Sequence, residues 1–287
     1  MRDPVDLQDA TRLAAADARS AESAGQTGEM EPFAEVPGGE RGSRASQRGS
    51  YGIDGGFAGL AVFGVMEAGL AGTVAWAIRH RRRIVAALAV AGGAAVAGSA
   101  ASYLYSTGPG KRAIWAQVLD ELDMHGDEHI LDVGCGRGAV LMLAARRLPA
   151  GRAVGADVWR RRDQSGNSRA ATERNAVTEG VRDRVELVDA DARDLPFESA
   201  SFDVVVSSLA ISNIRAAGGR ARALREAVRV LRPGGRLRIV DDGADRYAAV
   251  LRDAGCTGVA VRQLDWRTWY GLPGHHLPLV AAARPPG

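Results

Sequence analysis

The chain has 287 residues, of which 46% are hydrophobic and 25% are charged, and its formal net charge at pH 7 is +3. This length is enough for one α/β domain with additional segments, and the near balance of charge argues against a nucleic-acid partner. Two cysteines without neighbouring histidines, Cys135 and Cys256, predict neither a disulfide framework nor a zinc site, so we expect no metal.

Residues 1–52 are the first of three predicted regions. They are rich in Ala, Ser, Gly, Glu and Arg and poor in large apolar side chains, most clearly in "PGGERGSRASQRGS". A segment of this composition buries too little apolar surface to offset the entropy lost on ordering, so we expect it to be disordered. No charged stretch leads into an apolar core near Met1, which argues against a signal peptide.

Residues 53–105 are predicted to form a membrane hairpin of two apolar helices, at 57–78 and 84–105. The first carries one charge, Glu67, and the second carries none. Each is long enough to cross a hydrocarbon core of about 30 Å, and the alternative is a pair of helices buried in protein. The arginine-rich "RHRRR" between them disfavours a loop outside the cell, so a shallow hairpin that does not cross stays open.

Residues 106–287 are predicted to be an α/β domain, because strand-like and helical runs alternate along them. This alternation predicts a doubly wound, mostly parallel sheet of the Rossmann-like kind. Two strands near the end of the chain have no long helix between them, and we expect them to close a seven-stranded sheet as an antiparallel pair. The expected strands are 129–133, 153–156, 185–188, 202–207, 236–240, 259–264 and 277–283, and the expected helices lie near 111–122, 138–148, 168–179 and 217–231.

A glycine-rich turn follows the first strand of this domain, in "ILDVGCGRG" (130–138). A strand, a glycine turn and a helix in this order present free backbone N–H groups to a ligand. The glycines fit the dinucleotide fingerprint G-x-G-x-x-G/A as Gly134, Gly136 and Ala139, and residues 132–138 also fit D-x-G-x-G-x-G. Asp157, at the end of the second strand, suits ribose hydroxyls under either interpretation.

Four later motifs complete a resemblance between residues 106–284 and the class I S-adenosylmethionine-dependent methyltransferases. They are "AVGADVW", "DADARDLPF", "SFDVVVSSLAISNI" and "VLRPGGRLRIV". The dehydrogenase interpretation gives no role to "DLPF" or "VVVSSLAISNI", so we set it aside. The resemblance implies S-adenosyl-L-methionine as the cofactor, bound by Asp132, Gly134, Cys135, Gly136, Gly138, Asp157, Val158, Asp191, Ala192, Ser207 and Ser208.

The resemblance also implies a role for each part of this site. Asp132 is expected to orient the glycine loop and the amino end of the cofactor. The Asp191–Ala192 pair is expected against the adenine, and the Ser207–Ser208 pair faces the methionine part. Cys135 is expected to contribute its backbone and not its thiol.

Three stretches narrow the resemblance to bacterial, largely actinobacterial, methyltransferase-domain proteins with an N-terminal membrane hairpin. They are "YGID" (51–54), "WRRRDQSGNS" (159–168) and "LDWRTWYG" (264–271). Asn167 or Ser168 is expected to cap the following helix, and the competing role is for Asp163, Gln164 and Asn167 to line the mouth of the cofactor site. Trp159 either covers the adenine edge or packs on the sheet, and both interpretations stay open.

The base that would accept a proton from the methyl acceptor is not marked by a histidine at the usual places. Relatives commonly have histidine where this chain has Ser212, and a second histidine after the fifth strand, where this chain reads "DDGADRY". Histidine would be the natural base because its pKa lies near neutrality. The remaining candidates are Asp241, Asp242, His275 and His276, while Trp266, Trp269 and Tyr270 either wall an apolar acceptor pocket or pack in the core.

Together these features predict a membrane-associated methyltransferase whose catalytic domain faces the cytoplasm. A tethered domain meets lipid-dissolved molecules at high local concentration, so the expected acceptor is lipid-like or another hydrophobic small molecule. The alternative is a catalytically degenerate domain that binds the cofactor and serves as a membrane scaffold or sensor. The sequence defines neither the acceptor nor the oligomeric state.

Overall fold

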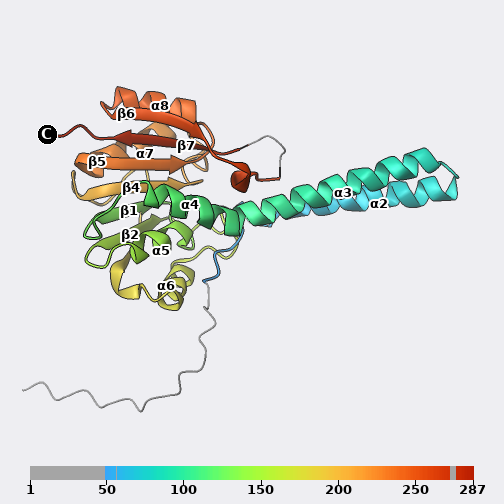
Figure 1. Cartoon of the computed structure of the whole chain (residues 1–287), viewed down its shortest axis with the longest axis horizontal. Helices are drawn as coiled ribbons and strands as arrows, with labels where there is room; N and C mark the ends of the chain where they lie inside the picture. The colour runs from blue at the N-terminus through green and yellow to red at the C-terminus, as the bar shows by residue number, and fades with distance from the viewer. Residues whose placement is uncertain (1–48, 56, 272–275) are drawn as a thin grey trace, which may run out of the picture. The chain divides into compact units, whose positions relative to one another are not determined.

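The computed structural model describes residues 49–55, 57–271 and 276–287. Residues 1–48, which we expect to be disordered, and the candidate base His275 lie outside the described residues. Within the described ranges, an apolar helical hairpin precedes an α/β domain (Figure 1).

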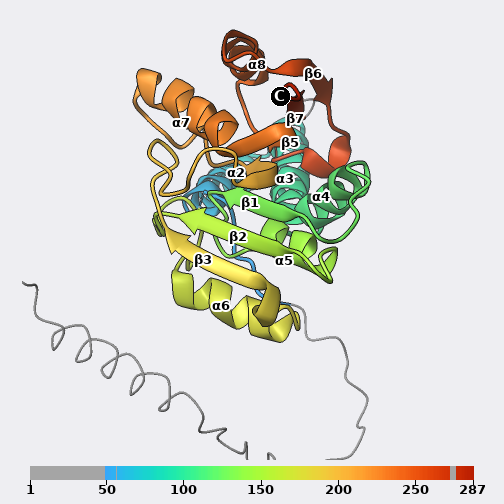
Figure 2. The same cartoon turned by 90° about the vertical axis from the view of Figure 1, so that its left-hand side faces the viewer.

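The domain is built on one seven-stranded sheet with the order β3-β2-β1-β4-β5-β7-β6. The first five strands in this order run parallel, and β7 lies antiparallel between β5 and β6. The predicted doubly wound, mostly parallel sheet with an antiparallel edge pair is therefore confirmed (Figure 2). The strands are β1 His129–Val133, β2 Arg152–Asp157, β3 Val185–Asp189, β4 Phe202–Ser208, β5 Leu231–Val240, β6 Thr257–Gln263 and β7 Pro278–Ala283.

Helices cover both faces of this sheet, and burial of their apolar sides holds the layers together (Figure 2). The α-helices of the domain are α4 Lys111–Asp120, α5 Ala139–Arg146, α6 Arg169–Thr178, α7 Ala217–Val230 and α8 Ala244–Asp253, with short 3-10 turns η2 Arg182–Arg184 and η3 Trp266–Thr268. The first three helices pack on one face around Trp115 and Leu141. The last two pack on the other face around Leu224 and Leu251.

The pattern of elements read from the sequence omits α8. Gly243, with a φ of 93°, turns the chain out of β5 into this helix. Tyr247, Ala248 and Leu251 then bury one face of it against the sheet. Because the helix has only 10 residues, its apolar repeat is too short to stand out from a polar loop.

The hairpin consists of α2 Ala58–Arg79 and α3 Arg83–Tyr105, which lie side by side (Figure 1). Both helices are long and apolar enough to cross a membrane, and little of either is buried within the protein. α3 continues through a π-helical turn, η1 Ser106–Gly110, into α4, so that residues 83–120 form one continuous helix. The connection between hairpin and domain is therefore helical and contains no flexible linker.

Residues 49–55, called the strap below, are hydrogen-bonded along the domain. The backbone N–H of Ser50 donates to Asn175 Oδ1 over 3.0 Å. The N–H of Ile53 donates to Ser165 Oγ over 2.8 Å, and its carbonyl accepts from the N–H of Ser165. The composition predicts disorder as far as residue 52, whereas polar contacts with distant residues order the chain from residue 49.

Candidate functional site

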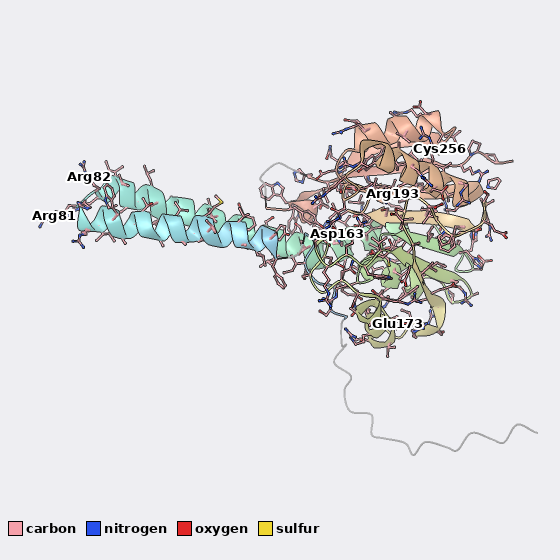
Figure 3. All side chains as sticks on the ribbon, turned by 180° about the vertical axis from the view of Figure 1, so that it is seen from behind. Arg81, Arg82, Asp163, Glu173, Arg193 and Cys256 are labelled. Atoms are coloured by element: carbon pink, nitrogen blue, oxygen red, sulfur yellow. The ribbon has the colours of Figure 1, made fainter. Side chains whose placement is uncertain are left out.

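A cavity of about 540 Å³ lies at the carboxyl ends of β1, β2, β3 and β4. Open parallel sheets bind ligands at this edge, where the turns that leave the strands bring backbone N–H groups and short side chains together. Figure 3 labels two residues of the lining, Asp163 and Arg193. The strands and the turns that leave them contribute Asp132, Gly134, Cys135 and Gly136 at β1, Ala156, Asp157 and Val158 at β2, Ala190, Asp191 and Ala192 after β3, and Ser208, Leu209, Ala210 and Ser212 at β4.

All the cofactor residues that the sequence predicts, except two, line this cavity. Gly138 precedes α5 with a φ of 83°, and a Cβ there would lie 2.7 Å from Cε of Met142, so close packing explains this glycine. Ser207 lies beneath the cavity, where its hydroxyl donates to the carbonyl of Val133 over 2.8 Å. The geometry thus gathers the predicted residues in one place, and their contacts with a cofactor stay a prediction.

The glycine loop needs its glycines at two positions that face the cavity. Gly134 has a φ of 74°, and a Cβ there would lie 2.1 Å from Cβ of Ala210. Gly136 has a φ of 52°, and a Cβ there would lie 2.5 Å from the side-chain oxygen of Gln164. Both the backbone conformation and the crowding therefore exclude larger side chains from the loop.

Asp157 ties the glycine loop to the end of β2. Its Oδ2 accepts from the N–H of Gly136 over 2.8 Å, and its Oδ1 accepts from the N–H of Trp159 over 2.5 Å. Burial raises the pKa of Asp157, and these hydrogen bonds oppose that rise. The side-chain amide of Asn167 also donates to Oδ1, over 3.5 Å, so Oδ2, which has one donor, keeps a lone pair that can accept from a ligand hydroxyl.

The structure places Trp159, Asn167 and Ser168, whose roles the sequence left open. Trp159 is not part of the cavity lining; its indole N–H donates to Asp189, at the end of β3. Ser168 caps α6, because its hydroxyl accepts from the N–H of Ala171. Asn167 lines the cavity, so both roles proposed for this pair occur, on different residues.

Asp132 is a buried carboxylate without a partner. Its side chain is only 1% exposed, and neither carboxylate oxygen has a hydrogen-bond partner among the described residues. Burial raises the pKa of Asp132 to about 7, while the charge of Lys111 opposes this rise and that of Asp157 adds to it. A cationic group entering the cavity would therefore supply what this carboxylate lacks.

Asp191 and Cys135 have surroundings that limit what they can do. The guanidinium of Arg193 holds the carboxylate of Asp191 over 2.6 Å and lowers its pKa to about 2, so Asp191 is ionised at neutral pH. Burial raises the pKa of the Cys135 thiol well above its usual value, which makes the thiol a poor nucleophile. Cys135 therefore offers its backbone to the cavity, as the resemblance implies.

The three stretches that narrow the resemblance meet at Asp54, in the strap. Oδ1 of Asp54 accepts from the side-chain amide of Gln164 over 3.2 Å. Oδ2 accepts from the hydroxyl of Tyr270 over 3.1 Å and pairs with Nζ of Lys111 at 2.6 Å. The hydroxyl of Tyr103, in α3, donates to the backbone carbonyl of Asp54. Asp54, Lys111, Tyr103, Gln164 and Tyr270 all line the cavity.

Sequence reasoning assigned no site role to Asp54, Lys111 or Tyr103. The signal for Asp54 was present, because "YGID", "WRRRDQSGNS" and "LDWRTWYG" each stand out from the generic motifs and each supplies one partner of this cluster. No comparable signal marks Lys111, which occupies an ordinary position in a short amphipathic helix.

The candidate bases that the structure describes lie outside the cavity lining. Asp241 is fully buried beside β5, where it accepts from the N–H groups of Ser212 and Asp242 over 2.9 and 2.7 Å, and burial raises its pKa to about 6. Asp242 and His276 are also absent from the lining, and His276 stacks on the ring of Trp269. Asp241 therefore supports the Ser212 loop from below.

Of the three aromatic residues expected to wall a pocket or pack in the core, Tyr270 lines the cavity. Trp266 is 59% exposed and stacks on Tyr105. Trp269 packs against His276. The aromatic side chains of the lining are thus Tyr270 and, from the hairpin, Tyr103, and their contact with a methyl acceptor stays a prediction.

Residues 131–239 match the protein family described as methyltransferase domain. Methyltransferase GfsG of Streptomyces halstedii is 35% identical over 153 residues, which cover 52% of this chain and 51% of that protein. The ubiquinone/menaquinone biosynthesis C-methyltransferase UbiE of Paracoccus denitrificans is 35% identical over 133 residues, which cover 46% and 50%. The crystal structure of a SAM dependent methyltransferase from Aquifex aeolicus superposes with a TM-score of 0.46 at 20% identity, covering 58% of this chain and 87% of that one.

The chain spans about half the length of the curated relatives it matches. The matched residues contain the glycine loop and the ends of β1 to β5, so they are the part of the chain that builds the sheet side of the cavity. Residues 131–239 are therefore similar to the methyltransferase domain of class I S-adenosylmethionine-dependent methyltransferases, and S-adenosyl-L-methionine is the cofactor of that class. The narrower subgroup with a membrane hairpin stays a prediction.

Proposed function

We propose that this chain is a membrane-anchored methyltransferase that transfers the methyl group of S-adenosylmethionine to a hydrophobic small molecule, with its catalytic domain facing the cytoplasm. One observation carries the proposal. The cavity that holds the glycine loop is also lined by residues at the base of the apolar hairpin, Tyr103 of α3 and Asp54 and Gly55 just before α2. The predicted cofactor site and the predicted membrane element thus share one cavity.

The residues that line the cavity fit the cofactor. Asp132 offers a partnerless buried carboxylate to an ammonium group, and Oδ2 of Asp157 keeps a lone pair for a ribose hydroxyl. Gly134 and Gly136 leave room for a ligand to approach the backbone. A volume of about 540 Å³ lies in the range of pockets that hold small molecules and cofactors.

When bound, S-adenosylmethionine supplies a methyl group activated by its sulfonium charge, so the chain mainly has to align the acceptor and exclude water. Tyr103 and Tyr270 form the aromatic wall available to an acceptor. Among the described residues that line the cavity there is no histidine, and a proton released by the acceptor would pass to solvent.

The hairpin supports a hydrophobic acceptor. Large apolar side chains are exposed along both helices, among them Val65 at 74% and Ile84 at 78%, which is typical of a surface that lipid covers. An aromatic series links this surface to the cavity, since the rings of Phe63 and Tyr103 lie 5.9 Å apart and those of Tyr103 and Tyr270 6.2 Å apart. The similarity to UbiE, named for quinone biosynthesis, agrees with an acceptor of this kind.

The membrane side of the proposal rests on charge as well. Arg81 and Arg82, labelled in Figure 3, lie at the turn between the two helices, where cations suit anionic lipid headgroups. Both cysteines are free and buried, as expected for a domain in a reducing compartment.

The test is methyl transfer by the full chain in detergent, with radiolabelled S-adenosylmethionine and, in separate reactions, a membrane-lipid extract and a water-soluble extract of the source organism. We expect label in the lipid extract, and none with Asp132→Ala. Label confined to the water-soluble extract would contradict the hydrophobic acceptor. One observation favours a second function, that of a cofactor-binding scaffold or sensor: the described lining contains none of the predicted bases. Binding of the cofactor without methyl transfer to either extract would support this function.

A further inference from the structure

Lys111 differs from the other cations that line the cavity in being buried. The described lining contains Lys111, Arg160, Arg162, Arg193 and Arg215. The side chain of Lys111 is 8% exposed, whereas those of Arg162 and Arg193 are 57% and 42% exposed. Arg160 and Arg215 are exposed as well. Lys111 is therefore the buried positive charge of this lining.

The ammonium group of Lys111 has donors to spare. Asp54 is its ion-pair partner at 2.6 Å, and the contacts of the described residues include no second acceptor for it. An ammonium has three N–H donors, so two remain available to a ligand in the cavity that Lys111 lines. A buried charge with unused donors is costly unless a ligand completes its surroundings.

The same cavity also contains a buried negative charge that lacks a hydrogen-bond donor. Asp132 is a buried carboxylate with no hydrogen-bond partner, and it lies close enough to Lys111 to respond to its charge. A partnerless anion and an incompletely bonded cation in one cavity are complementary to a zwitterion. The amino-acid end of S-adenosylmethionine is such a group, because one carbon atom joins its ammonium and its carboxylate.

We propose that Lys111, held in place by Asp54, binds the α-carboxylate of S-adenosylmethionine while Asp132 binds its α-ammonium. This inference rests on the proposed function, and it adds a binding residue from outside the matched residues 131–239. The charges of Asp132, the ligand ammonium, the ligand carboxylate and Lys111 then alternate in sign. The strap thereby becomes part of the cofactor site, because Asp54 orients the lysine.

The competing explanation is that Lys111 serves only to fasten the strap to α4 through Asp54. A fastening role predicts that loss of the charge weakens every ligand of the cavity alike, whereas carboxylate binding predicts an effect that depends on the ligand. Decarboxylated S-adenosylmethionine separates the two, since it keeps the ammonium and the sulfonium and lacks only the carboxylate.

The experiment is calorimetry of the full chain in detergent with S-adenosylmethionine and with its decarboxylated form. Lys111→Met is expected to weaken S-adenosylmethionine about 10- to 100-fold, the range of a charged hydrogen bond, and to leave the decarboxylated ligand unchanged. Arg112→Met is the matched control, because Arg112 is the next residue of α4 and pairs with Glu179, which is not part of the lining. It should leave the ratio of the two affinities as in the wild type.

Lys111→Arg keeps a cation at the site and guards against a folding defect in Lys111→Met; it should retain most of the preference for the carboxylate. Equal weakening of both ligands in Lys111→Met, or no weakening of either, would overturn the assignment. Wild-type protein that binds both ligands equally would overturn it too, while leaving the proposed function intact. Wild-type protein that binds neither would refute the proposed function itself.

Discussion

The pKa of Asp132 makes a quantitative prediction about cofactor binding. The carboxylate is fully buried, and burial raises its pKa to about 7 in the free protein. An ammonium group that binds beside it favours the ionised form, so the proton must leave when the ligand enters. We therefore expect binding of S-adenosylhomocysteine at pH 7 to release about half a proton per ligand.

The size of the pH effect follows from the ionised fraction of Asp132. With a pKa of about 7, this fraction is about one half at pH 7, about one-eleventh at pH 6 and about 1% at pH 5. The ligand's amino group stays protonated over this range. The affinity is therefore expected to fall about fivefold from pH 7 to pH 6 and about fiftyfold from pH 7 to pH 5, as long as the pKa in the complex lies below 5.

Calorimetry measures both quantities. Titrations at pH 7 in buffers with small and large ionisation enthalpies give the number of protons released, and titrations at pH 7, 6 and 5 give the affinity. Asp132→Asn cannot lose a proton at this position, so its weaker binding should show no proton release and little dependence on pH. Wild-type protein with no proton release and a constant affinity between pH 7 and pH 5 would refute the role given to Asp132.

Three further predictions concern stability and the loop. Without ligand, Asp132→Asn should be more stable than wild type at pH 8 by up to about 4 kcal/mol. The reason is that the pKa of Asp132 rises from 3.8 in the unfolded chain to about 7 in the folded protein, so the wild type must ionise a buried acid above pH 7. The gain in thermal unfolding temperature should vanish near pH 4, where Asp132 is protonated in the folded protein. Glu179→Gln should cost about 3 kcal/mol in urea unfolding, since the side chain of Glu179, which follows α6, is fully buried and holds the strap and two arginines. Glu173→Gln within α6, where the side chain is 43% exposed, should cost under about 0.5 kcal/mol. Gly134→Ala should abolish binding of S-adenosylhomocysteine, because the added Cβ would meet Cβ of Ala210. Gly255→Ala is the control: Gly255 has a similar φ and open space around it, so this variant should bind normally. Equal binding by the two variants would refute the role given to close packing at Gly134.

Much of the fold was predictable because its signals are local. Each strand of the sheet is a short apolar run bounded by turn residues, and the glycine loop follows a strand and precedes a helix. These signals do not depend on contacts between distant parts of the chain. The strand bounds therefore agree with the prediction within a few residues, apart from β5, which begins at Leu231 and not near 236.

The side of the cavity that the strap and Tyr270 build was not predictable in this way. Asp54 and Tyr270, which are hydrogen-bonded, lie 216 residues apart in the sequence. Which side chains meet Asp54 depends on how the strap crosses the domain, and no short-range pattern encodes that path. The same holds for Asp241, whose position after β5 suggested a base, while the direction of its side chain places it beneath the Ser212 loop.

The measurement that tests the central claim most directly is equilibrium binding of S-adenosylhomocysteine and of a nicotinamide dinucleotide to the full chain in detergent. We expect that S-adenosylhomocysteine binds, that the dinucleotide neither binds nor displaces it, and that binding is lost in Gly134→Ala. Tight binding of the dinucleotide with no detectable binding of S-adenosylhomocysteine would contradict this claim.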